Sequence, residues 1–153
     1  MKKRKKAAAI HAAAVVLCII YLVVLLYLLF LSDRYGRAAG YNEYHYNLIP
    51  FAEISRFIHF RTQIDTELFL VNIVGNVLAF VPFGYLLPQA YRRMDSFWKV
   101  TLLGFLLSLL VEIMQLLLMV GIFDVDDLIM NVMGVMLGFG LFKLVFPPNW
   151  GEL

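Results

Sequence analysis

The stretch FDVDDLIMNVMGVMLGFGLFKLVF, residues 123–146, joins a group of carboxylates to a long apolar run. The run from Leu128 to Phe146 is long enough to cross a hydrocarbon core, which takes about 20 helical residues. Three acids, Asp124, Asp126 and Asp127, stand at its start. The stretch therefore predicts a membrane-spanning helix with carboxylates at its mouth.

Three further apolar runs are long enough to span a membrane: Ala7–Leu31, Leu68–Tyr91 and Val100–Phe123. Hydrophobic residues make up 62% of the chain and the mean hydropathy is +0.80, whereas about half of a soluble domain is apolar. We predict an all-α fold, a multi-pass transmembrane helical bundle with four spans. No repeat or linker divides the chain, so residues 1–153 are expected to form one membrane domain.

Basic residues predict the orientation of the spans. KKRKK occupies residues 2–6, and the loop between the second and third runs contains Arg92, Arg93 and Lys99, while the loop before residue 128 has no basic residue. By the positive-inside rule, both termini are expected to be cytoplasmic and FDVDD to face outward. The basic tail adjoins a membrane helix, so we expect it to contact anionic lipid headgroups and no nucleic acid.

The segment LIPFAEISRFIHFR, residues 48–61, is too polar to span. Pro50 suits a first helical turn, and Phe51, Ile54, Phe57 and Ile58 recur on one helical face. We expect an interfacial amphipathic helix on the outer side of the membrane.

Three of the four spans carry stripes of small and polar residues at helical spacing. The stripes are Asn72, Gly75, Asn76 and Ala79, then Gly104, Ser108, Glu112 and Gln115, then Asp127, Asn131, Gly134 and Gly138. Small residues and amides commonly join membrane helices, at about 0.6 kcal/mol per polar contact. Glu112 is different, because a carboxyl in hydrocarbon costs at least a few kcal/mol and is by default a functional candidate.

With the assigned orientation, these polar side chains converge on the outer half of the membrane. We therefore predict an outward-facing polar pocket with Glu112 at its floor. The expected ligand-binding residues are Asn72, Asn76, Glu112, Gln115, Asp124, Asp126, Asp127 and Asn131. No metal or other cofactor is expected. If a divalent cation were bound, the three aspartates would hold it.

Four motifs in this order resemble the VanZ-like family of bacterial membrane proteins. They are NLIPF at 47–51, NIVGNVLAFVPFGYLLP at 72–88, EIMQ at 112–115 and FDVDDLIMNVMGVMLG at 123–138. Residues 1–46, an N-terminal tail, the first span and the start of the outer loop, carry none of them. The positions that match the family motifs are Asn47, Pro50, Phe51, Asn72, Asn76, Pro82, Gly84, Glu112, Gln115, Asp124, Asp126, Asp127, Asn131 and Gly134. Many members have an arginine shortly before the aspartates, where this chain reads VGIF, so these acids are expected to lack a local cation.

The resemblance implies a multi-pass protein of the bacterial cytoplasmic membrane. The family is named for its association with resistance to teicoplanin, a lipoglycopeptide that acts outside the cell on lipid-linked peptidoglycan precursors. Our leading hypothesis is a non-enzymatic protein that binds or shields a lipid-linked or lipopeptide envelope ligand through the outward-facing polar pocket. The ligand would be a membrane lipid or a lipid-linked envelope precursor, and the glycopeptide antibiotic would be affected indirectly.

Two other classes of function remain open. The first is a membrane enzyme acting on a lipid-linked phosphate or envelope lipid, with Glu112 as the catalytic acid or base or with a divalent cation held by the aspartates. The second is a subunit of a membrane assembly or transporter, because four spans are too few for most transporters unless they oligomerise.

Overall fold

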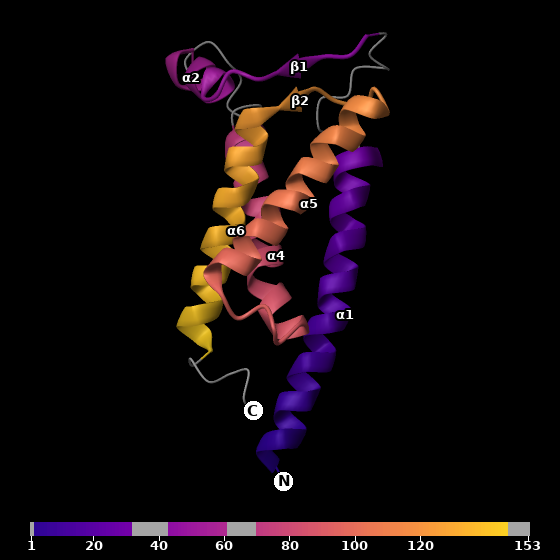
Figure 1. Cartoon of the computed structure of the whole chain (residues 1–153), viewed down its shortest axis with the longest axis vertical. Helices are drawn as coiled ribbons and strands as arrows, with labels where there is room; N and C mark the ends of the chain where they lie inside the picture. Colours follow the sequence, from indigo (N-terminus) through magenta and orange to yellow (C-terminus); the bar gives the residue numbers. More distant parts are fainter. Residues whose placement is uncertain (1, 32–42, 61–69, 147–153) are drawn as a thin grey trace.

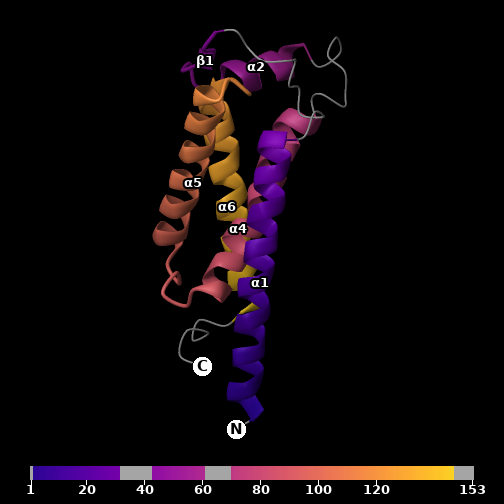
Figure 2. The ribbon, with the colours of Figure 1, turned by 90° about the vertical axis from the view of Figure 1, so that its right-hand side faces the viewer.

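The computed structural model describes residues 2–31, 43–60 and 70–146. Four long helices, α1 (Lys2–Leu31), α4 (Asn76–Ala90), α5 (Phe97–Leu117) and α6 (Val125–Val145), form an elongated bundle (Figure 1). The segments Ala8–Leu31, Asn72–Ala90, Phe97–Leu117 and Val125–Val145 are long and apolar enough to cross a membrane. The predicted all-α bundle with four spans is therefore confirmed. Helix α6 packs against both α4 and α5, while α1 packs against α4 (Figure 2).

A small cap of non-spanning elements lies at one end of the bundle. It contains β1 (Tyr46–Asn47), α2 (Ala52–His59) and β2 (Phe123–Asp124), whereas α1 begins and α6 ends at the opposite end (Figure 1). The two strands pair in parallel, Tyr46 with Phe123 and Asn47 with Asp124. This pairing was not predicted, because each strand is only two residues long and the pair joins distant parts of the chain.

The amphipathic helix is shorter than predicted. Helix α2 begins at Ala52, and Pro50 precedes it instead of occupying its first turn. Phe51 has a φ of 64°, a left-handed conformation that stops the helix from extending toward Pro50. Phe57 is buried, while Ile58 and Phe60 are exposed.

The ends of α5 and α6 differ from the boundaries expected from hydropathy. The run expected to continue to Phe123 leaves the helix at Leu118, because Met119 adopts a φ of 54°. The Val120 N–H then donates to the Gln115 carbonyl at 3.0 Å, which closes a Schellman-type end. Helix α6 begins at Val125, three residues before the apolar run, because Asp124 caps it.

Helix α4 continues from a π-helical segment, η2 (Leu70–Gly75), and contains Pro82 and Pro88. Pro82 cannot donate a backbone hydrogen bond to the preceding turn. The Tyr21 hydroxyl of α1 donates to the Ala79 carbonyl in that turn at 2.8 Å. Helix α1 thus supplies a polar contact where α4 is weakened by its proline.

Helices α4 and α6 approach closely through glycines. A Cβ at Gly134 would collide with the Val77 carbonyl oxygen, and one at Gly138 would collide with that of Val81. Gly84 provides the reciprocal contact, because a Cβ there would meet the Val135 carbonyl. The expectation that the small-residue stripe allows close helix contact is confirmed.

The apolar core and the polar residues occupy different parts of the bundle. A hydrophobic cluster joins α1, α4, α5 and α6 through Leu25, Phe80, Phe83, Val100, Val135, Phe139 and Phe142. Its aromatic part, which includes Phe97 edge-on to Phe139 with ring centroids 5.9 Å apart, lies toward the end of α6. The polar side chains of the candidate site lie between this cluster and the cap.

A pair of alanine substitutions tests the α4–α6 contact. Gly138→Ala should lower the free energy of unfolding by about 1–3 kcal/mol, because the new Cβ overlaps the backbone of α4. Gly140→Ala is the matched control, since its Cβ would have no neighbour within 4 Å and should be neutral or stabilising by up to about 1 kcal/mol. Thermal unfolding in detergent measures both. Equal stabilities would contradict the packing described here.

Candidate functional site

Asp124 connects the start of α6 to β1. Its carboxylate accepts the Asp126 N–H at 2.8 Å, which is the usual hydrogen bond of an N-cap aspartate. The Asn47 amide lies 3.3 Å from both Asp124 carboxylate oxygens and donates toward them. Asp124 therefore holds β1 beside β2 in addition to beginning the fourth span.

Asp126 holds the beginning of α2. Its side chain is completely buried, and its Oδ2 accepts the N–H groups of Glu53 at 2.8 Å and Ile54 at 3.1 Å. Its Oδ1 accepts the N–H of Phe51. The first N–H groups of a helix have no partner within the helix, and α2 has no side-chain cap of its own. Asp126 supplies that cap from a different helix.

Glu112 lies beneath the cap in α5. It is 2% exposed, and its Oε2 accepts the Asp124 N–H at 3.1 Å. Asp124 and Asp127, at the start of α6, lie near it. Glu112 thus lies directly beneath β2 and forms one hydrogen bond with the backbone of that strand.

Two pairs of polar side chains link the helices below the cap. Asn76 of α4 donates a hydrogen bond to Asp127 of α6. One turn further along α6, the Asn131 amide donates to the Ser108 hydroxyl of α5 at 2.8 Å. Glu112 follows Ser108 by one turn of α5, as Asn131 follows Asp127 by one turn of α6. The two helices therefore place polar side chains opposite each other at two successive turns. The Asn131 Oδ1 is buried and has no hydrogen-bond partner among the residues described.

Gln115 and Asn72 are placed differently from the other predicted residues. Gln115 donates to the Leu29 carbonyl of α1 at 3.3 Å, so its side chain is directed toward another helix. Asn72 lies in η2 with an exposed side chain. The structure instead brings together Asn76, Glu112 and Asp127, with Asn131 one turn below. Asp124 and Asp126 form the overlying connection to the cap.

A positive charge from α2 acts on Asp124. Arg56 forms an ion pair with Glu53 and is close enough to Asp124 to favour its charged form. Burial nevertheless raises the pKa of Asp124, against the hydrogen bonds from the Asp126 N–H and the Asn47 amide. The chain has no basic residue shortly before the aspartates, and folding brings Arg56 of α2 close enough to act on the charge of Asp124.

Three contributors to this region were not identified as site residues from the sequence. Asn47 and Arg56 reach it through the cap, and Ser108 was interpreted as a packing residue. The NLIPF motif could have indicated a role for Asn47. Its amide stands directly before an apolar segment and has no obvious local function, which suggests a partner elsewhere in the chain. In the chain segments that the structure describes, no group of three or more His, Cys, Asp or Glu side chains is arranged to hold a metal ion.

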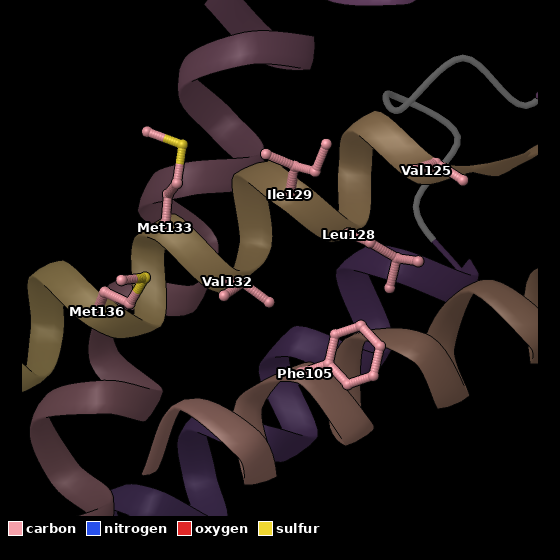
Figure 3. Close-up of a pocket in the computed structure, with 7 residues that line it drawn as sticks. All are labelled: Phe105, Val125, Leu128, Ile129, Val132, Met133 and Met136. Atoms are coloured by element: carbon pink, nitrogen blue, oxygen red, sulfur yellow. The ribbon is translucent and has the colours of Figure 1, made fainter. Parts of the chain in front are cut away.

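A shallow groove of about 380 Å³ lies between α5 and α6 (Figure 3). Its lining is entirely apolar: Phe105, Val125, Leu128, Ile129, Val132, Met133 and Met136. None of the predicted ligand-binding residues lines it. The groove and the polar cluster are therefore separate features of the same two helices.

Four apolar spans enclosing buried carboxyl and amide side chains define a multi-pass membrane protein. The chain belongs to the VanZ/LLP1 family, whose profile matches residues 18–146. The resemblance inferred from motifs is confirmed, and the match extends into α1, where no motif was recognised.

The chain is 33% identical over 104 residues to Protein VanZ of Enterococcus faecium. The alignment covers 68% of this chain and 56% of that protein, so it spans little more than half of the relative. No solved structure matches the chain.

Proposed function

We propose that this protein binds or shields a lipid-linked or lipopeptide ligand of the cell envelope through its polar cluster. Family membership and similarity to Protein VanZ support this proposal. The cluster comprises Asn76, Glu112, Asp127 and Asn131. In this proposal Asp124 and Asp126 act differently, by keeping the cap in place over the cluster.

The observation that carries the proposal is the burial of Glu112 close to Asp127 inside the bundle. The ion pairs found in the described segments are Arg56 with Glu53 and Lys99 with Asp95, and neither neutralises these two acids. A carboxyl at this depth costs several kcal/mol, and an amide would bond the helices at lower cost. The unpartnered Asn131 Oδ1 adds a buried acceptor that a ligand or water would satisfy.

The proposal requires the cap to face the outside of the cell. We therefore expect a cysteine placed at Asp95 to be labelled from the cytoplasm and one at Ile122 from the exterior, in a chain with Cys18 replaced by alanine. The reason is the excess of Lys and Arg in the loop between α4 and α5. Membrane-impermeant maleimide on intact cells, compared with permeabilised cells, distinguishes the two sides. Labelling of position 95 alone on intact cells would place the cluster on the wrong side.

A protection assay tests the function. Cells that produce the chain should survive higher concentrations of teicoplanin than cells that lack it, and production of Glu112→Gln at an equal level should not protect. A glycopeptide without an acyl chain serves as the chemical control. Equal protection by Glu112→Gln would remove the polar cluster from the proposed mechanism.

A further inference from the structure

The groove between α5 and α6 is about as long as one membrane leaflet is thick. Its lining extends along α6 from Val125, next to the cap, to Met136, and Phe105 of α5 forms the facing wall (Figure 3). At 1.5 Å per residue, the eleven steps from Val125 to Met136 correspond to roughly 16 Å, about half of a ~30 Å hydrocarbon core. The groove thus starts at the cap and extends along α6 over a length that matches one leaflet.

The groove offers only apolar contacts, and both of its helices are membrane spans. Hydrocarbon chains are what a bilayer presents to such a surface. Leu128 at the floor is buried, whereas Met133 on the rim is half exposed, so the surface is concave. A chain lying in a concave groove contacts more protein atoms than a chain on a flat helix face, and flexible methionines adapt to its shape.

We propose that this groove holds one alkyl chain of a lipid, inserted from the cap side with the headgroup end toward Val125. Because the proposed ligand is lipid-linked, this inference rests on the proposed function and adds the binding site for the ligand's alkyl chain. The polar cluster and the groove then serve different parts of one amphiphile. Binding at the groove depends on the chain and not on the headgroup.

Tryptophan quenching by a bromolipid tests the groove directly. The reporter is Phe105→Trp in the full chain, with Trp98 and Trp150 replaced by phenylalanine. The control reporter is Leu106→Trp, which differs in depth by only one residue and is exposed but does not line the groove. Phosphatidylcholine with brominated acyl chains is titrated into each protein in dodecylmaltoside micelles.

We expect quenching of Phe105→Trp to saturate, with its midpoint at a roughly tenfold lower bromolipid fraction than for Leu106→Trp, equivalent to about 1.4 kcal/mol. Val132→Phe should fill the groove and abolish the difference, whereas Leu137→Phe on the same helix should not. Ile129→Phe is a second filling variant, and thermal unfolding identifies any variant that fails to fold.

Equal quenching at positions 105 and 106 would overturn the inference, because both sites would then sense only bulk lipid. Weaker quenching at position 105 would also overturn it, since a second copy of the chain would then cover the groove. Glu112→Gln should leave the quenching unchanged, because Glu112 does not line the groove. Saturable quenching together with full protection by Glu112→Gln would contradict the proposed function of the polar cluster and leave the groove assignment intact.

Discussion

Replacing Asp126 with alanine should release α2 from the end of the bundle. The substitution removes the acceptor for the N–H groups of Phe51, Glu53 and Ile54. Hydrogen bonds to a charged acceptor contribute about 1.5–3 kcal/mol each, and contributions from one group are not additive. We therefore expect the docking of α2 to weaken by about 3–5 kcal/mol.

Hydrogen exchange measures this local effect. The amide protons of Glu53 and Ile54 should exchange about 100-fold to 4000-fold faster in Asp126→Ala, since each tenfold change corresponds to about 1.4 kcal/mol. The spanning helices should stay protected, because their packing depends on the apolar core and the glycine contacts. Asp95→Asn is the control, as it removes an exposed ion pair that contributes little to stability. Unchanged exchange at Glu53 and Ile54 would show that Asp126 does not hold α2.

Glu112→Gln should separate function from folding. Glutamine keeps the shape of the side chain and an acceptor for the Asp124 N–H, so the connection between α5 and β2 should persist. Removing a buried carboxyl should leave the bundle as stable as before or more stable. Ligand binding should fall by at least about tenfold, or about 1.4 kcal/mol, because the proposed site uses the Glu112 carboxyl.

Asp127→Asn provides the companion test. It retains a side-chain acceptor for the Asn76 amide and removes the other buried charge at the same level. Thermal unfolding in detergent, compared with ligand retention, distinguishes a structural role from a functional one. Full retention in both variants would assign both carboxylates to structure alone.

Much of the fold could be predicted because hydrocarbon constrains the chain strongly. Each span must form its backbone hydrogen bonds within the helix and expose apolar side chains to lipid. The four runs can therefore be recognised from composition. The Gly134 and Gly138 spacing likewise predicted close contact, since two glycines four residues apart share one helix face. The sequence pattern placed Glu112 at the floor of a pocket and the aspartates at its rim, so it did not predict the hydrogen bond between Glu112 and the backbone N–H of Asp124.

The cap could not be predicted, because its contacts join segments that no local pattern relates. Asp126 and Phe51 are 75 residues apart in sequence. An aspartate at the start of a helix normally serves its own helix, and here Asp124 does so while Asp126 caps α2. The rotation of each helix was also underdetermined. Gln115 was expected in the cluster, but its side-chain amide donates a hydrogen bond to the Leu29 carbonyl of α1.

Native mass spectrometry after gentle extraction tests the central claim most directly. The full chain should retain a lipid or lipid-linked precursor in stoichiometric amount, while Glu112→Gln should lose it and Asp95→Asn should keep it. The mass of the retained molecule would identify the chemical class of the ligand. Retention of the same molecule by the full chain and by Glu112→Gln, or a protein free of bound lipid in every case, would contradict the proposed binding site.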